Sequence, residues 1–293
     1  MNIKAAFKIL WLSIVDSFKG HIWKWLTGSF SALLGLLQFG KNFLNTTLET
    51  SVKIGLYFLV GLFIVRFLLF LFRNSFKYLH NLYKEVKYGE AIILLSNAFS
   101  KVHNYRKQKE KTDEDFTRTM KYLCDNVKDL FVKKNGCKCS VSIKVPVSGE
   151  LVEGASVMNL VRDSENTRKR DSANYSAVDH TIIGNTAFRK SLNKVLRNNS
   201  NGFAYVNNNI SKTTDYDNTS TEVYENGKLP YESEIVVPII PKEIDENRIY
   251  NALGFLCVDC ESANKFDSKY DIALVEGVAD GIYDVLHSQV LNN

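Results

Sequence analysis

The longest hydrophobic run in the chain lies between residues 54 and 72. Its sequence, IGLYFLVGLFIVRFLLFLF, contains one charged residue, Arg66. A helix of this length spans about 28 Å, which matches the roughly 30 Å hydrocarbon core of a bilayer. Arg66 lies near enough to the end of the run for its side chain to reach toward the interface. We therefore predict a transmembrane helix over residues 54–72, with a buried core helix of a soluble protein as the alternative.

Two segments upstream of this run also carry apolar patterns. Residues 1–24 repeat bulky apolar side chains at helical spacing, with three lysines along one flank. This pattern is typical of a helix on an anionic bilayer surface, or of a helix that packs against other membrane helices. Residues 25–40 are uncharged and form either a second span, paired with 54–72 as a hairpin, or an interfacial segment. We favour the hairpin because it places both basic flanks on the cytoplasmic side, and we assign residues 1–75 to a membrane region.

Residues 76–111 are expected to form a helical connector. Apolar residues from Phe76 to Ile93 loosely follow a seven-residue spacing. Such spacing is typical of coiled coils, although the stretch covers only two and a half heptads. A parallel dimer stalk is the structure that this pattern favours.

From residue 112 onward, short alternating strands are separated by amphipathic helices. Thr112-x-x-Asp115 resembles a capping box, and an apolar stripe then runs from Phe116 to Leu130. Further helices are expected at 186–197 and at 266–286, the last one capped by Ser268. Strands are expected at 139–145, 157–161, 203–206, 233–239 and 253–259, with a polar insertion at 163–180. This order predicts an α+β domain over residues 112–293, with an antiparallel sheet, helices on one face, and the other face free for a ligand or partner.

The charge of the chain divides between the same two parts. The whole sequence has 37 Lys and Arg against 32 Asp and Glu, a net charge of +5, and a mean hydropathy of −0.15. Residues 1–89 hold eleven basic and three acidic residues, which leaves 26 basic and 29 acidic residues in 90–293. Because the basic excess coincides with the apolar part, the pattern favours a membrane anchor, and we expect no nucleic-acid partner.

Residues 231–286 resemble the C-terminal half of a GAF domain. In that family an apolar strand ending in proline precedes a strand of the form G-x-L-x-x-D, and Phe-x-x-x-x-Asp then starts the final helix. The positions that match this pattern are Pro238, Gly254, Leu256, Asp259, Phe266 and Asp271. The likeness is close over about 55 residues and loose over about 175. A GAF-like antiparallel sheet with flanking helices is therefore expected, with a PAS-like sensor sheet as the alternative.

The resemblance also implies where a ligand would bind. GAF domains bind small molecules or serve as dimerisation modules, and their pocket would lie here between the sheet and the loops of residues 150–230. By this analogy we expect the following residues near a ligand: Asn185, Thr186, Phe188, Tyr205, Asn207, Asp215, Tyr216 and Ser233. The resemblance identifies no particular cofactor. Cyclic nucleotides are not favoured, because the segment beginning at Asn264 lacks the Asp-Glu pair of that signature.

The five cysteines raise the question of metal or redox chemistry. Cys137-x-Cys139 and Cys257-x-x-Cys260 could together supply four thiolates, the number that a structural zinc site needs. However, Cys257 and Cys260 are expected on opposite faces of one strand, so we expect no metal site. A redox-sensing pair, as in the GAF-type reductases of free methionine sulfoxide, is an alternative, although the positions do not match that family's pattern. An odd cysteine count without a secretory signal favours a reducing, cytoplasmic compartment.

The sequence contains no nucleophile elbow, P-loop, dinucleotide glycine motif or zinc-protease motif, so we expect no catalytic residue and no enzyme. It predicts instead a membrane-anchored GAF-like sensory protein of a bacterial inner membrane, with its soluble domain facing the cytoplasm. The expected partners are the lipid bilayer, further copies of this chain in a homodimer or larger homo-oligomer, and an unknown small molecule or protein. Ligand binding would act on the membrane helices, in one version by perturbing the bilayer. The alternative is a non-catalytic dimerisation or interaction module tethered to the membrane.

Overall fold

The computed structural model describes residues 3–18, 28, 31, 35, 38, 48–147, 151–171, 180–197, 202–222, 224, 227–241 and 252–292. These residues fall into two compact units, Met1–Val86 and Lys87–Asn293. The predicted second membrane segment, residues 25–40, lies outside the described residues except for four isolated positions.

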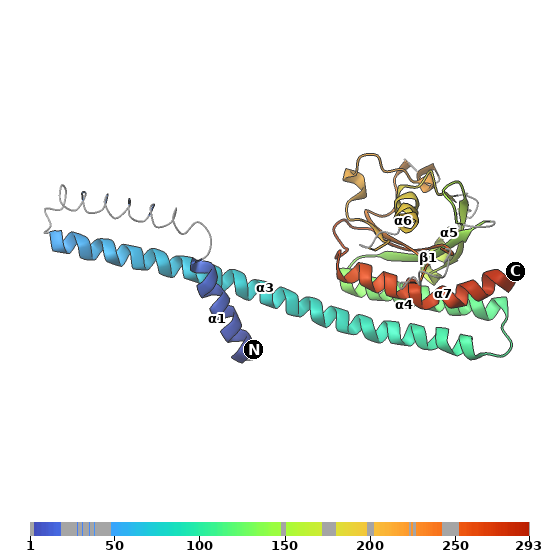
Figure 1. Cartoon of the computed structure of the whole chain (residues 1–293), viewed down its shortest axis with the longest axis horizontal. Helices are drawn as coiled ribbons and strands as arrows, with labels where there is room; N and C mark the ends of the chain where they lie inside the picture. The colour runs from blue at the N-terminus through green and yellow to red at the C-terminus, as the bar shows by residue number, and fades with distance from the viewer. Residues whose placement is uncertain are drawn as a thin grey trace. The chain divides into compact units, whose positions relative to one another are not determined.

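The described part of the first unit is helical. Helix α1 covers Ile3–Phe18, and helix α3 covers Leu48–Lys107, so that α3 continues into the second unit (Figure 1). Among the described residues, α3 contains one stretch that is long and apolar enough to cross a bilayer, and the predicted segment 54–72 lies within it. Within this unit the side-chain amide of Asn74 donates a hydrogen bond to the hydroxyl of Ser13, at 3.2 Å.

The second unit contains a six-stranded antiparallel sheet with the strand order β3-β2-β1-β6-β5-β4. The strands are β1 (Cys139–Pro146), β2 (Ser156–Arg162), β3 (His180–Thr181), β4 (Tyr205–Asn207), β5 (Ser233–Pro238) and β6 (Phe255–Cys260). The helices are α4 (Asp113–Asn135), α5 (Ser164–Asp171), α6 (Thr186–Leu196) and α7 (Tyr270–Asn292), with 3-10 turns at η2 (Ile210–Lys212) and η3 (Thr219–Glu222). The expected α+β class with an antiparallel sheet is therefore confirmed.

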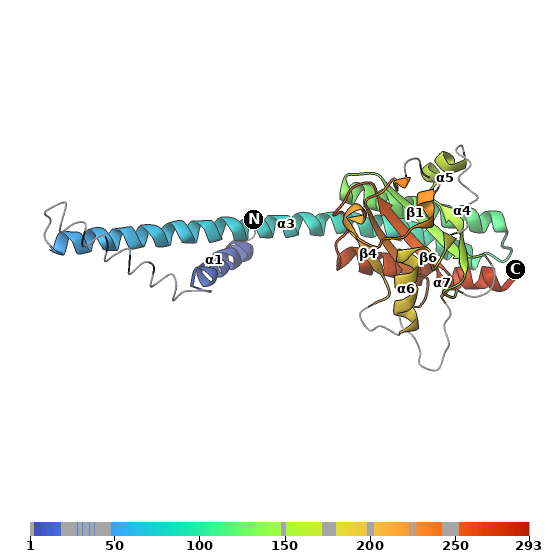
Figure 2. The same cartoon turned by 90° about the horizontal axis from the view of Figure 1, so that it is seen from above.

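The sheet separates two hydrophobic cores. Helices α4 and α7 and the C-terminal turns of α3 cover one face, where Phe131, Ile143 and Ile282 are fully buried. Helix α6 covers part of the other face, and the ring of Phe188 stacks on that of Phe255 there at 4.8 Å. Figure 2 shows α6 on the face of the sheet opposite α4 and α7. The prediction that all helices lie on one face is wrong, because the apolar stripe of α6 needs the second face for its own burial.

The residues that cap the helices agree with the sequence prediction for α4 and differ from it for α7. The hydroxyl of Thr112 accepts the N–H of Asp115 and caps α4, as the capping box predicts, and α4 ends at Gly136 with φ 65°. Helix α7 is capped by Asp267, whose carboxylate accepts the N–H groups of Lys269 and Tyr270, so the predicted cap at Ser268 is wrong. A carboxylate accepts hydrogen bonds more strongly than a hydroxyl does, which favours the aspartate in this position.

The predicted polar insertion at residues 163–180 is wrong at both of its ends. Helix α5 begins directly after Asp163, whose buried carboxylate accepts the N–H of Asn166 at 3.0 Å. His180 begins β3 by pairing with Val157 of β2. Residues 172–179 lie outside the described residues.

Candidate ligand-binding site

A row of polar residues crosses the sheet on the face that α6 covers. The strand register places Ser140 of β1 opposite Asp259 of β6, Asp259 opposite Glu234 of β5, and Glu234 opposite Asn207 of β4. Since side chains of directly paired residues point to the same face, all four belong to one face of the sheet. Two carboxyl groups therefore stand on neighbouring strands in the middle of the sheet.

This row forms part of the wall of a cavity of about 300 Å³. Ser140, Arg162, Tyr231 and Asp259 line it, together with residues of α5 and the loop before β5. A smaller recess of about 30 Å³ extends along the sheet toward α6, and Asp259 and Tyr231 line both spaces. The residues that line the recess on the α6 side are Lys144, His180, Asn185, Phe188, Asn218, Ser220, Glu234, Val236 and Cys257.

Glu234 is the most strongly perturbed acid of the site. Its residue surface is 2% exposed. Burial above all, and then the charge of Asp259, raise the pKa of its carboxyl to about 8, while a hydrogen bond from Tyr216 opposes the rise. At neutral pH the carboxyl of Glu234 is therefore mostly protonated, whereas an exposed glutamate would be charged.

Tyrosine hydroxyls surround Glu234. The side-chain amide of Asn218 donates to the hydroxyl oxygens of Tyr216, at 3.1 Å, and Tyr231, at 2.9 Å. Burial raises the pKa of both tyrosines, and the charge of Glu234 adds to the shift. These tyrosines thus remain neutral hydrogen-bonding groups at physiological pH.

Basic groups lie close to the acidic pair on the same face. Arg162 pairs with Ser142 across β1 and β2, and it lines the larger cavity. The ammonium group of Lys144 lies 5.7 Å from the centre of the Phe188 ring and lines the recess. The ring of His180 is held by a 2.9 Å hydrogen bond between Nδ1 and the hydroxyl of Thr219. The cavity and its recess therefore present cationic and acidic groups together.

Five of the residues predicted near a ligand lie on this face. The side chain of Asn185 caps α6 by accepting the N–H groups of Ala187 and Phe188, and both Asn185 and Phe188 line the recess. Tyr216 contacts Glu234. Tyr205 pairs with Val236, and Asn207 pairs with Glu234 at the end of the polar row.

The other three predicted residues line neither the cavity nor the recess, and they have other roles. Thr186 is buried and fastens α6 to the following loop, because its hydroxyl donates to the carbonyl of Asp215 and accepts the N–H of Asp217. Asp215 itself is exposed and has a left-handed backbone conformation, with φ 60°. Ser233 points to the other core and donates to the carbonyl of Ser262, at 2.8 Å. We therefore leave these three residues out of the proposed site.

Sequence reasoning missed the charged residues of the site, including Glu234, Arg162 and Lys144. A signal for Glu234 was present, because SEIVVP places a glutamate inside an otherwise apolar strand that is buried on both faces. A charged residue in such a strand usually has a specific partner or function. Arg162 and Lys144 lie near strand ends, where their approach to the cavity depends on the strand register.

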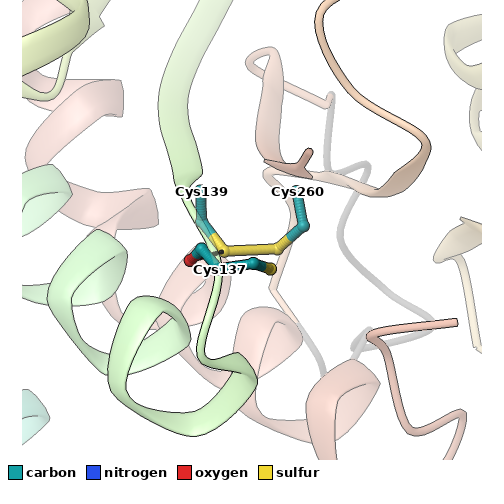
Figure 3. Close-up of side chains that lie close together, drawn as sticks. All are labelled: Cys137, Cys139 and Cys260. Carbon is teal, nitrogen blue, oxygen red and sulfur yellow. Dashed lines mark hydrogen bonds between the residues drawn. A yellow bond between two sulfur atoms is a disulfide. The ribbon is translucent and has the colours of Figure 1, made fainter. Parts of the chain in front are cut away.

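The cysteines are arranged differently from the expectation. Cys139 and Cys260 are joined by a disulfide, and Cys137 lies beside it (Figure 3). The three sulfur atoms lie within 4.8 Å of one another, and among the described residues they are the group close enough to hold a metal ion. Within this group of three, the disulfide leaves Cys137 as the free thiol. Cys257 and Cys260 face opposite cores, as predicted.

Comparison with known proteins concerns the fold alone. No family model matches the chain, and no curated protein matches it. The GAF domain of a phosphoenolpyruvate-protein phosphotransferase from Acinetobacter is similar, with 11% identity over 69% of this chain and 98% of that one, at a TM-score of 0.41. A type II free methionine-R-sulfoxide reductase from Thermoplasma acidophilum has 18% identity, covering 60% and 94% of the two chains, at a TM-score of 0.38. The antiparallel six-stranded sheet with flanking helices is thus similar in fold to these GAF domain structures.

One expectation is corrected by this comparison. Free methionine-R-sulfoxide reductases recur among the similar structures, including enzymes from Staphylococcus aureus and from Neisseria meningitidis. The Neisseria enzyme has 11% identity over 70% of this chain and 94% of that one, at a TM-score of 0.40. The prediction that this chain is not an enzyme, which rested on missing motifs, is contradicted by the presence of these enzymes among the similar structures.

Proposed function

We propose that the second unit is a sensory domain that binds a small zwitterionic molecule of the amino-acid class. The observation that carries this proposal is the pair of carboxyl groups, Asp259 and Glu234, on neighbouring strands. Asp259 lines the cavity that Arg162 also lines, and it lines the adjoining recess together with Glu234. The ammonium group of such a ligand would lie beside Asp259 and Glu234, and its carboxylate group would lie beside Arg162.

The acidic pair favours a cation because like charges on directly opposed strand positions repel each other. In the free protein, protonation of Glu234 relieves the repulsion, in agreement with its pKa of about 8. An ammonium group beside Asp259 and Glu234 would relieve it instead, and Glu234 would then lose its proton. Tyr231 adds a hydroxyl to the same wall.

Arg162 supplies the complementary charge. A guanidinium group binds a carboxylate through two parallel hydrogen bonds, which fixes the orientation of the ligand as well as its charge. A cavity of about 300 Å³ lies at the lower end of the range for small-molecule sites, so the size fits a small metabolite better than a nucleotide or a tetrapyrrole.

We further propose that α3 anchors this domain in a membrane and carries the ligand signal to it. The C-terminal turns of α3 contribute Ala91, Ala98, Val102 and Tyr105 to the core formed with α4 and α7. The same helix contains the apolar stretch of residues 54–72. A change in packing against α4 or α7 would thus act on a helix that is continuous with the membrane segment.

Thermal unfolding of the full chain in detergent tests ligand binding. We expect one or more zwitterionic amino acids, at millimolar concentration, to raise the unfolding midpoint, because ligand binding to the folded state adds to its stability. The corresponding amino-acid amides and N-acetylated amino acids should have much smaller effects, since each lacks one of the two charges.

Matched variants locate the site. Arg162→Gln and Asp259→Asn should abolish the response to the ligand, whereas Glu153→Gln, a change of an exposed acid, should preserve it. A response that is equal in all of these variants, or a panel of amino acids without any effect on the wild-type chain, would show that the cavity does not bind zwitterions.

A further inference from the structure

Cys137, Cys139 and Cys260 form a cluster at the end of the central strand pair of the sheet. Cys139 of β1 lies directly opposite Cys260 of β6. The N–H of Glu261 donates to the carbonyl of Lys138, which makes Lys138 and Glu261 a hydrogen-bonded pair and the adjoining cysteines a non-hydrogen-bonded pair. Side chains approach most closely in such pairs, and the Cα atoms of the two cysteines are 4.2 Å apart.

The three cysteines differ in their accessibility. Cys139 is 6% exposed and Cys260 is fully buried, whereas Cys137 is half-buried, in the short loop between α4 and β1. In Figure 3 the side chain of Cys137 runs beside the disulfide, with its sulfur on the Cys260 side. Cys137 is thus the most exposed residue of the three.

A polar group is directed at the disulfide sulfurs. The side-chain amide of Asn135 donates to Sγ of Cys260 at 3.3 Å and approaches Sγ of Cys139 at 3.9 Å. An N–H donor at this distance stabilises a thiolate that forms when the disulfide breaks. The ammonium group of Lys265 lies at the same end of α4, where it donates to the carbonyl of Asn135. The surroundings of the cluster thus favour a departing thiolate.

The other two free cysteines have inert surroundings. Cys124 and Cys257 are buried, and burial raises the pKa of both thiols, to about 12 for Cys257. Such thiols hardly ionise at neutral pH, and the thiolate is the reactive form. They provide matched controls within the same domain.

We propose that Cys137 is a relay thiol, through which low-molecular-weight thiols in solution reduce the buried Cys139–Cys260 disulfide and through which the corresponding low-molecular-weight disulfides re-form it. The thiolate of Cys137 attacks Sγ of Cys260, a Cys137–Cys260 bond forms, the Cys139–Cys260 bond breaks, and Cys139 leaves as a thiolate that takes up a proton. This first step exchanges one disulfide for another without net oxidation or reduction.

The reductant then acts on the accessible sulfur. A thiolate of the reductant attacks Sγ of Cys137, giving a mixed disulfide and releasing Cys260, which takes up a proton. A second reductant thiolate attacks the reductant sulfur of that mixed disulfide, so Cys137 is released and the reductant leaves as its own disulfide. In total the protein gains two electrons and two protons, and two reductant thiols are oxidised.

The position of the cluster connects this exchange with the proposed ligand site. Cys139 lines the cavity of about 300 Å³ together with Asp259. Breaking the disulfide would release the end of β1 from β6 at the point where both strands form the cavity wall. The same cavity also offers a competing route, in which a small thiol attacks Cys139 directly and Cys137 plays no part.

The rate of reduction of the full chain distinguishes the two routes. Protein purified in detergent without reductant is treated with glutathione, samples are quenched with an alkylating agent, and the Cys139–Cys260 linkage is quantified by mass spectrometry of the digested protein. We expect Cys137→Ser to slow the loss of this linkage about tenfold or more, and Cys124→Ser to leave the rate unchanged. Equal rates in wild type and Cys137→Ser would overturn the proposal.

A second measurement does not depend on rates. In Cys139→Ser the relay predicts a Cys137–Cys260 disulfide after oxidation with oxidised glutathione, because Cys137 is then the remaining neighbour of Cys260. Finding Cys260 as a free thiol or only as a glutathione adduct in that variant would overturn the proposal. So would the absence of the Cys139–Cys260 linkage from the oxidised wild-type chain.

Discussion

Glu234 shows how a single residue can conflict with its surroundings in the free protein. It lies in a strand whose other residues are buried, opposite a second acid, and within a network of tyrosine hydroxyls. Its ionised form is unfavourable because of burial and because of Asp259. Glu234 therefore destabilises the folded domain most at pH values at which its carboxyl is charged. The free energy of unfolding should thus depend on pH.

Glu234→Gln should remove this dependence. The pKa of Glu234 is about 8 in the folded chain and about 4.5 when unfolded, so its stabilising contribution is complete below pH 4.5 and is lost as the pH rises through 8. One pKa unit corresponds to about 1.4 kcal/mol, so the variant should gain a few kcal/mol relative to wild type between pH 5 and pH 9. Urea denaturation followed by circular dichroism measures this gain, with Glu153→Gln as the control that should follow the wild-type profile.

Gly254 is a second residue whose identity the structure requires. A Cβ atom at this position would overlap the carbonyl oxygen of Lys144 on the neighbouring strand, and the backbone has φ 155°. Gly254→Ala should therefore destabilise the chain by about 1–3 kcal/mol. Gly277 lies in α7 with nothing within 4 Å of its Cβ position, so Gly277→Ala should stabilise it by up to about 1 kcal/mol. Equal shifts of the denaturation midpoint in the two variants would contradict the claim that a Cβ atom at Gly254 destabilises the sheet.

At the scale of elements, three helices meet at one buried ion pair. Lys134 near the end of α4 pairs with Asp271 in the first turn of α7, and both side chains are almost fully buried. The hydroxyl of Tyr88 in α3 donates to the same carboxylate at 2.8 Å, and the N–H of Asp267 donates to it at 2.7 Å. Hydrogen bonds on both carboxylate oxygens thus stabilise the charge and connect the C-terminal part of α3 to α4 and α7.

Removing one partner of this pair should be costly. Asp271→Asn leaves the ammonium group of Lys134 buried without its counter-charge, and we expect a loss of about 3–5 kcal/mol in the free energy of unfolding. The exposed pair of Arg106 and Asp284 joins α3 and α7 as well, but Asp284→Asn should cost less than about 1 kcal/mol. Denaturation curves of the two variants measure the difference, and similar losses would indicate that the buried pair does not hold these helices together.

The elements that could be predicted are those in which apolar residues recur at the regular spacing of a helix or a strand. An apolar stripe runs from Phe116 to Leu130, and apolar residues alternate in 139–145. Each pattern indicates one face that is buried against a neighbouring layer, and both elements are present as α4 and β1. Helix α5 could not be predicted in this way, because it has no apolar stripe and depends on a cap at Asp163 and on contacts of Ser164 with Asp125. Strand β3 is two residues long, which is too short for any period.

The site was only partly predictable for a related reason. Asn185, Phe188 and Tyr216 were expected from the likeness to a GAF domain, and they lie at the recess or beside Glu234. The acidic pair depends on which residue of β5 lies opposite which residue of β6, and the disulfide depends on the register of β1 with β6. Neither register can be read from one strand alone, since pairing joins positions far apart in the sequence.

At the scale of the whole molecule, the apolar and basic N-terminal part contrasts with the acidic remainder. Side chains along residues 54–72 of α3 are largely exposed, as expected for a surface in contact with lipid. We expect the full chain to stay with the membrane fraction during extraction with alkaline carbonate, which releases peripheral proteins.

Lysines within the span should weaken this retention. Each lysine near the bilayer centre costs about 2.5–3.5 kcal/mol, so the double variant Leu62→Lys/Ile64→Lys, at exposed positions beside the centre of the span, should be released in larger part. Ile92→Lys/Ile93→Lys makes the same chemical change at exposed positions of the same helix outside the span, and it should remain with the membranes. Release of the wild-type chain, or equal retention of both variants, would contradict the membrane anchor.

The measurement that tests the ligand site most directly is calorimetric titration of the full chain with the zwitterion that stabilises it most, at pH 7 in two buffers of different ionisation enthalpy. Glu234 starts mostly protonated, so an ammonium group bound beside it should release close to one proton per ligand. The heat of binding should then differ between the buffers for the wild type and agree between them for Glu234→Gln. Equal heats in both buffers for the wild type, or the same proton release in Glu234→Gln, would contradict a cation site at Asp259 and Glu234.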